Sequence, residues 1–134
     1  MAEGAFRVIL IDSSVWIETL HSPTFRDYAR ISEIVDENAC TCGPVIQEVL
    51  QGIREDRVLQ EVSNRMDILP YLEATRETYR AAAALFRRCR RKGAQVQPGD
   101  ALIASIAIEN DVSIWTLDED FTRIRQHAGL RLYR

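Results

Sequence analysis

The stretch that decides the fold is VILIDSSVWIE, residues 8–18. Its first four residues are apolar and mostly β-branched, which is typical of a strand buried on both faces in a parallel sheet. The run ends abruptly in one carboxylate and two hydroxyls. We expect Ser13 or Ser14 to cap the helix that follows, with Glu18 completing a capping box. Asp12 then lies at the carboxyl end of a central strand, where open α/β sheets bind ligands.

The composition is that of one ordinary globular domain. The chain has 134 residues, of which 46% are hydrophobic and 28% are charged, and we expect residues 1–134 to form a single domain with a proper core. The net charge of −3 argues against a protein that binds nucleic acid through bulk positive charge. It does not exclude a nucleic-acid enzyme, because carboxylates that hold a divalent cation make the isolated chain look too acidic.

The three cysteines form no recognisable metal or redox motif. Cys40, Cys42 and Cys89 lack Cys-x-x-Cys spacing, and the chain has only two histidines. We therefore expect small buried side chains in a reducing compartment. The sequence shows neither a signal peptide nor an apolar run of the ~20 residues that a membrane span needs, so we expect a cytoplasmic protein.

Helical and strand patterns alternate along the chain. We expect helices over about 15–20, 25–37, 44–53, 54–66, 74–92 and 98–108, and a short one that ends near 125. We expect strands over about 8–11, 39–42, 67–71 (alternatively an extended connector), 112–117 and 130–132. In the long helix the predicted buried stripe is Tyr79, Ala82, Ala83, Phe86 and Cys89. The alternation predicts a three-layer, doubly wound α/β fold, with a mainly parallel sheet of four to five strands and helices on both faces.

Four acidic residues lie near the same edge of the predicted sheet. Asp12 and Asp118 each follow a predicted strand, and Glu48 and Asp100 lie early in predicted helices. All four can converge at the carboxyl edge of a parallel sheet, where their repulsion favours a bound cation such as Mg²⁺ or Mn²⁺. Three of them also have a simpler explanation: Asp100 as a helix-dipole charge, Glu48 as a solvated helix residue and Asp118 as a helix cap. Asp12 is harder to explain in this way, because a buried strand rarely ends in Asp-Ser-Ser.

Four blocks of the sequence resemble one known family. They are LIDSSVWI at 10–17, EVLQG at 48–52, DALIA at 100–104 and TLDEDF at 116–121. Their order and spacing resemble those of PIN-domain ribonucleases, most of all the VapC-type toxins of bacterial toxin–antitoxin pairs. Each block alone is weakly specific, but four in order cover essentially the whole chain.

The resemblance implies a Mg²⁺- or Mn²⁺-dependent endoribonuclease that cuts single-stranded or loop RNA. It also implies a small antitoxin partner, whose cationic side chain reaches the acidic site, and a homodimer. The family's acidic quartet maps onto Asp12, Glu48, Asp100 and Asp118. The family's hydroxyl positions near the metal are matched by Ser14 and Thr116, and Asp120 is a second acid that can support or replace Asp118.

The chemistry of phosphodiester hydrolysis assigns a role to each acid. The reaction needs a nucleophilic water and stabilised charge on the phosphate, which divalent ions supply. As a hypothesis, Asp12 and Asp100 hold the main ion, and Asp118 binds it directly or through water. Glu48 orients or deprotonates the attacking water.

The densest basic run of the chain has two interpretations. Its arginines can contact an RNA backbone or simply complement a helix C-terminus; they are Arg87, Arg88, Arg90 and Arg91. Trp16 and Trp115 adjoin predicted buried elements, so we expect them in the core rather than stacked on bases.

Two other classes of protein remain as alternatives. A phospho-receiver domain needs a second acid beside Asp12 and a lysine after a late strand, but Ser13 follows Asp12 and Lys92, the only lysine, lies at a helix end. A catalytically silent PIN-like RNA-binding module is disfavoured by the intact quartet.

Overall fold

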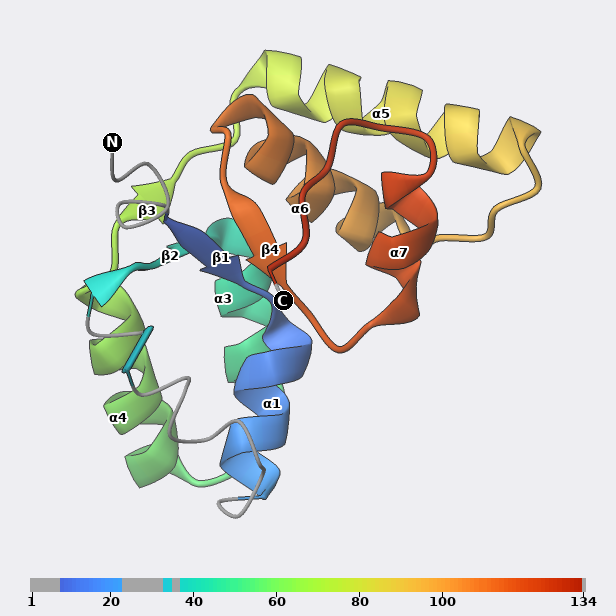
Figure 1. Ribbon diagram of the computed structural model, residues 1–134. Helices are drawn as coiled ribbons and strands as arrows, with labels where there is room; N and C mark the ends of the chain where they lie inside the picture. The colour runs from blue at the N-terminus through green and yellow to red at the C-terminus, as the bar shows by residue number, and fades with distance from the viewer. Residues whose placement is uncertain (1–7, 23–32, 35–36, 134) are drawn as a thin grey trace.

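A computed structural model describes residues 8–22, 33–34 and 37–133 of the chain (Figure 1). Most of the helix expected over 25–37 therefore lies outside the described residues. No helix within the described parts of the chain is both long and apolar enough to cross a membrane.

A four-stranded parallel sheet forms the centre of the fold. Its order is β3 (Tyr71–Leu72), β2 (Ala39–Cys42), β1 (Ile9–Ile11) and β4 (Ser113–Trp115). All three strand pairs are parallel, with Leu10 opposite both Cys40 and Ile114. Every residue of β1, β2 and β4 is buried, as expected for strands covered on both faces. Of the strand expected over 130–132, the structure has one parallel bridge, from Leu132 to Ile114.

Helices cover both faces of the sheet, as the alternating pattern predicts (Figure 1). One group comprises α1 (Ser13–His21), α3 (Gly43–Gln51) and α4 (Asp56–Asp67). The other comprises α5 (Arg76–Arg91), α6 (Pro98–Glu109) and α7 (Glu119–Arg125). The chain builds β1, β2 and β3 outward in one direction and then returns to place β4 on the other side of β1. With right-handed crossovers, that return puts α5 and α6 on the face opposite α1 and α3.

The core agrees with several expectations from the sequence. Leu10, Ile11 and Ile114 have no exposed surface, and Trp16 and Trp115 are buried beside them. All three cysteines are free and buried. The body of α6 is buried nearly all round, as its continuous apolar sequence predicts.

Two local predictions are wrong. The cap of α1 is Asp12, which accepts a hydrogen bond from the backbone N–H of Ser14, so neither serine caps the helix. In α5, Tyr79 and Ala83 are exposed. The buried residues of this helix are Thr78, Ala82, Leu85 and Cys89. The run of alanines at 81–84 gives no clear apolar face, so packing against α6 sets which side of the helix is buried.

Thr78 ties the start of α5 to the end of α6. Its hydroxyl donates to the two carboxylate oxygens of Glu109, at 2.8 and 3.1 Å, and its side chain is fully buried. It also forms a capping box with Thr75. We expect Thr78→Val to lower the free energy of unfolding by about 2 kcal/mol, because a charge-assisted hydrogen bond and part of a cap are lost. Urea unfolding measures this loss.

The matched control for this change is Thr122→Val. Thr122 is exposed on α7, so its replacement is expected to change stability by no more than about 0.5 kcal/mol. Equal unfolding free energies for the two variants would contradict the importance of the link between Thr78 and Glu109.

Candidate metal centre

The topology of the sheet opens a site beside β1. The strand order reverses at β1, because β2 lies on one side of it and β4 on the other. Ligands bind at such a switch point, outside the carboxyl ends of the strands. Asp12 follows β1 at this edge, and Thr116 and Asp118 follow β4.

Asp12 is fixed in place by two hydroxyls. Its Oδ2 accepts from Ser14 Oγ at 2.7 Å and from Thr116 Oγ1 at 2.8 Å. The Asp12 side chain is buried, with a relative exposure of 2% for the residue. Thr116 Oγ1 also accepts from the backbone N–H of Asp118 at 2.9 Å. Ser14 and Thr116 therefore bring the ends of β1 and β4 together. Among the described residues, Oδ1 of Asp12 has only a long contact to Ser13 Oγ, at 3.5 Å.

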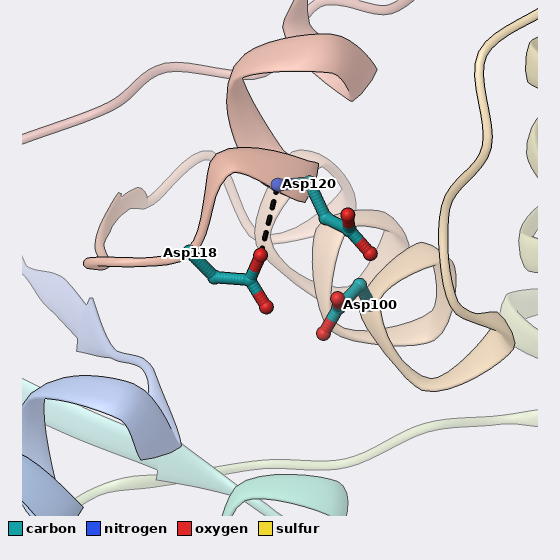
Figure 2. Close-up of side chains that lie close together, drawn as sticks. All are labelled: Asp100, Asp118 and Asp120. Atoms are coloured by element: carbon teal, nitrogen blue, oxygen red, sulfur yellow. Dashed lines mark hydrogen bonds between the residues drawn. The ribbon is translucent and has the colours of Figure 1, made fainter.

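Three carboxylates form the tightest acidic cluster in the described part of the chain. One oxygen from each of Asp100, Asp118 and Asp120 lies within 4.8 Å of the others. Figure 2 shows the three side chains gathered around a common space, Asp100 from the first turn of α6 and the other two from the start of α7. Asp118 caps α7 by accepting from the backbone N–H of Asp120 at 2.9 Å. Asp118 is therefore both the N-cap of α7 and a member of the acidic cluster.

Both carboxylate oxygens of Asp120 accept hydrogen bonds from residues outside the acidic cluster. Its Oδ2 accepts from the backbone N–H of Gln97 at 2.9 Å, and its Oδ1 accepts from Arg123 Nη1 at 2.7 Å. Neither partner was among the residues predicted for the site. The sequence contains a signal for one of these contacts: Asp120 and Arg123 are three residues apart, as ion-paired residues on a helix often are.

Glu48 is held beside the start of α6. Ser13 Oγ donates to Glu48 Oε1 at 2.6 Å, and Ser13 is itself buried. Glu48 Oε2 lies so close to Gly99 that a Cβ there would be 3.3 Å from it, which places the carboxylate next to the start of α6. Glu48 and Asp12 are outside the group of three acids that lie within 4.8 Å. Ser13, considered from the sequence only as a helix cap, is the residue that orients Glu48.

Burial, together with nearby negative charge, raises the pKa of two groups in this region. Burial raises the pKa of Asp100 to about 8, and a hydrogen bond with Asp120 and the charges of Asp118 and Asp12 act in the same direction. Burial also raises the pKa of Cys42 to about 11, with smaller contributions from Asp12 and Glu48. The donors that cluster at this edge are carboxylate oxygens. Such a set fits Mg²⁺ or Mn²⁺ better than the thiolate-preferring metals.

The predicted basic residues lie at the end of α5, and two of them have contacts within the fold. Arg88 Nη1 donates to the carbonyl of His127 at 3.0 Å. The guanidinium of Arg90 lies over the ring of Phe86, 5.6 Å from its centre. Arg87 and Arg91 are exposed. Packing and helix-end electrostatics thus account for part of this basic run.

We expect the Asp100→Asn protein, without metal, to unfold at a higher temperature than the wild type at pH 8. A carboxyl group whose pKa rises from 3.8 to about 8 on folding contributes stability at low pH. That stability is lost as the pH rises through this window. The difference is therefore expected to be a few degrees at pH 8 and to vanish near pH 4. Mn²⁺ is expected to raise the unfolding temperature of the wild type but not of the variant.

Thermal unfolding in EDTA and in Mn²⁺, at both pH values, measures these effects. Asp67→Asn is the control, because Asp67 is exposed at the end of α4, away from the site. A wild type that responds to pH and Mn²⁺ no differently from Asp100→Asn would show that Asp100 is not part of a charged, metal-binding cluster.

Comparisons with known proteins identify the family. The PIN domain family matches residues 9–126. The VapC ribonuclease Mb1587 of Mycobacterium bovis and the ribonuclease VapC11 of Mycobacterium tuberculosis are each 30% identical over 129 residues, 92% of this chain and 96% of theirs. Among solved structures, the DNA-bound VapBC of Salmonella typhimurium has a TM-score of 0.78 at 20% identity, covering 96% of this chain and 98% of that one. VapBC2 of Rickettsia felis, bound to a promoter DNA fragment, has a TM-score of 0.75 at 17% identity, covering 94% and 97%. The fold and the curated relatives agree: the chain belongs to the PIN-domain family, within its VapC group.

Proposed function

We propose that this chain is a divalent-metal-dependent endoribonuclease that acts as the toxin of a toxin–antitoxin pair. The observation that carries the proposal is the gathering of Asp100, Asp118 and Asp120 at the switch point of the sheet, where Asp100 is buried. Three carboxylates at that distance repel one another unless a cation or protons lie between them. The relatives named VapC ribonuclease support RNA as the substrate.

The residues divide into metal-holding and water-orienting groups. Asp12, Asp100 and Asp118 hold a Mg²⁺ or Mn²⁺ ion through carboxylate oxygens. When bound, such an ion lowers the pKa of a coordinated water and neutralises charge on the phosphate. Glu48 orients the attacking water or accepts its proton. The 2.6 Å hydrogen bond from Ser13 supports this role, because it fixes one oxygen of Glu48 and leaves the other available.

Asp118 is the better candidate than Asp120 for a direct ligand. Both oxygens of Asp120 already accept strong hydrogen bonds, from Gln97 N–H and from Arg123. Asp118 accepts a hydrogen bond on Oδ1, and Oδ2 has no hydrogen bond among the described residues. Asp120 is then a positioning residue that keeps the start of α7, and so Asp118, close to Asp100.

We expect Asp12→Asn to lower the rate of RNA cleavage at least a thousandfold without loss of the fold, since an amide is a poor ligand for a hard cation. The assay is cleavage of a mixed pool of single-stranded RNA in Mg²⁺ or Mn²⁺, with EDTA as the metal-free control. Asp67→Asn is expected to cleave like the wild type. Circular dichroism and thermal unfolding verify that each variant is folded. An active Asp12→Asn protein, or full cleavage in EDTA, would contradict the proposal.

A comparison of two variants separates a ligand from a positioning residue. Asp118→Asn is expected to lower kcat about a thousandfold and to weaken Mn²⁺ binding. Asp120→Asn is expected to lower kcat only about tenfold, because its effect reaches the metal through Asp118. The opposite order of the two losses would make Asp120 the direct ligand.

The toxin role requires a partner protein. Structural neighbours titled as VapBC and toxin–antitoxin complexes support a small antitoxin for this chain as well, and we propose that the toxin also forms a homodimer. Co-expression with the product of a neighbouring small gene is expected to yield a stable complex and to restore growth. Unimpaired growth of cells that express the free, folded and active nuclease would argue against the toxin role but not against RNA cleavage.

A further inference from the structure

A polar hollow adjoins the acidic cluster on the side of Asp120. Its volume is about 490 Å³, within the range of small-ligand sites. It is formed by the connection between α5 and α6, together with two residues of α7. The lining residues are Gly93, Ala94, Gln95, Val96, Gln97, Asp120 and Arg123.

The shape of the hollow depends on the end of α5. Gly93 follows the last residues of this helix with a φ of +78°, a left-handed conformation that glycine adopts at little cost. The turn directs the chain into the connection that carries Gln95 and Gln97. Both glutamine side chains are exposed, and each offers an amide that can donate and accept hydrogen bonds.

Arg123 is the cation of the hollow. Its hydrogen bond to Asp120 uses one of five guanidinium N–H donors, and 46% of the side chain remains exposed, compared with 14% for Asp120. Arg123 thus contacts the acidic cluster through Asp120 while it presents further donors to solvent in the hollow. Guanidinium groups bind phosphates strongly and with defined geometry.

We propose that this hollow is the subsite for a nucleotide that flanks the scissile phosphate. Arg123 binds the phosphate of that nucleotide, and Gln95 and Gln97 contact its base. The inference rests on the proposed function, because only an RNA strand held at the acidic cluster would extend into the hollow. Proteins read single-stranded RNA through hydrogen bonds to the edges of unstacked bases, which side-chain amides on an exposed connection can make.

The subsite also addresses a problem of charge. The chain carries a net charge of −3, and an acidic cluster repels a polyanion on either side of a bound metal ion. Arg123, which contacts the cluster through Asp120, attracts the adjoining phosphate without entering the metal site. Arg123 therefore positions the substrate, whereas the carboxylates hold the metal ion that the reaction needs.

The test compares Arg123→Gln with Arg125→Gln, an exposed arginine of the same helix that does not line the hollow. In Mn²⁺, Arg123→Gln is expected to raise KM for single-stranded RNA about tenfold, with kcat changed less than threefold. The slope of log(kcat/KM) against log salt is expected to become shallower by about 0.7, the value for one phosphate contact to a single strand. Arg123→Lys retains a charge and is expected to recover that slope.

Base contacts are tested by sequencing the cut ends of a mixed RNA pool. Gln95→Ala and Gln97→Ala are expected to change the base preference next to the cut about fivefold. Both are expected to leave the salt slope unchanged. Gln126→Ala, at the exposed end of α7, is the control and is expected to keep the wild-type preference.

Equilibrium binding of labelled RNA to the Asp100→Asn protein, with and without Arg123→Gln, gives a readout that needs no cleavage. An Arg123→Gln change that lowers kcat and Mn²⁺ affinity but leaves KM, RNA binding and the salt slope unaltered would overturn the subsite. In that case Arg123 acts only on Asp120. A wild type that cleaves no RNA in either metal would overturn the proposed function and the subsite with it, whereas cleavage with wild-type behaviour of Arg123→Gln would overturn the subsite alone.

Discussion

Repulsion among carboxylates at one edge of the sheet is the constraint on which the rest of this structure depends. Four of the five acids are held by different partners: Asp12 by two hydroxyls, Glu48 by Ser13, Asp118 by a backbone N–H, and Asp120 by Arg123 and Gln97 N–H. These hydrogen bonds oppose the tendency of the acids to move apart. Burial raises the pKa of Asp100, and the charges of Asp118 and Asp12 raise it further. A cation between the carboxylates would relieve their repulsion.

The parallel topology explains why such distant residues meet. Asp12 and Asp118 are 106 positions apart in the sequence, yet they follow strands that are direct neighbours. Thr116 bonds to both, through its hydroxyl. The α6 helix, buried along its body, then presents Asp100 at the same edge with little freedom to withdraw. The same packing that stabilises the core therefore assembles the candidate site.

Much of this arrangement could be predicted from the sequence, and the remainder depends on packing. The apolar run before Asp12 fits only a buried strand, and the continuous apolar body of α6 fits only a buried helix. These two placements predict the parallel sheet and bring Asp100 close to Asp118. The buried side of α5 could not be predicted, because the alanines of this helix fit several faces. Thr78 faces inward because it donates a hydrogen bond to Glu109 on the neighbouring helix α6. Ser13 and Gln97 act through contacts that spacing alone does not reveal, whereas Arg123 lies three residues after Asp120, a spacing typical of ion pairs on a helix. Asp120 lies 23 positions from Gln97, and only the folded chain brings them together.

The central claim is that the carboxyl edge of this sheet holds a divalent metal ion. A crystal of the protein grown with Mn²⁺ tests it most directly, because the anomalous scattering of manganese locates the ion without assumptions about ligands. The account predicts a peak among the acids, at about 2.1 Å from oxygens of Asp12, Asp100 and Asp118, with Asp120 still bonded to Arg123. Fully occupied manganese bound elsewhere, with the three carboxylates ligating nothing, would contradict it.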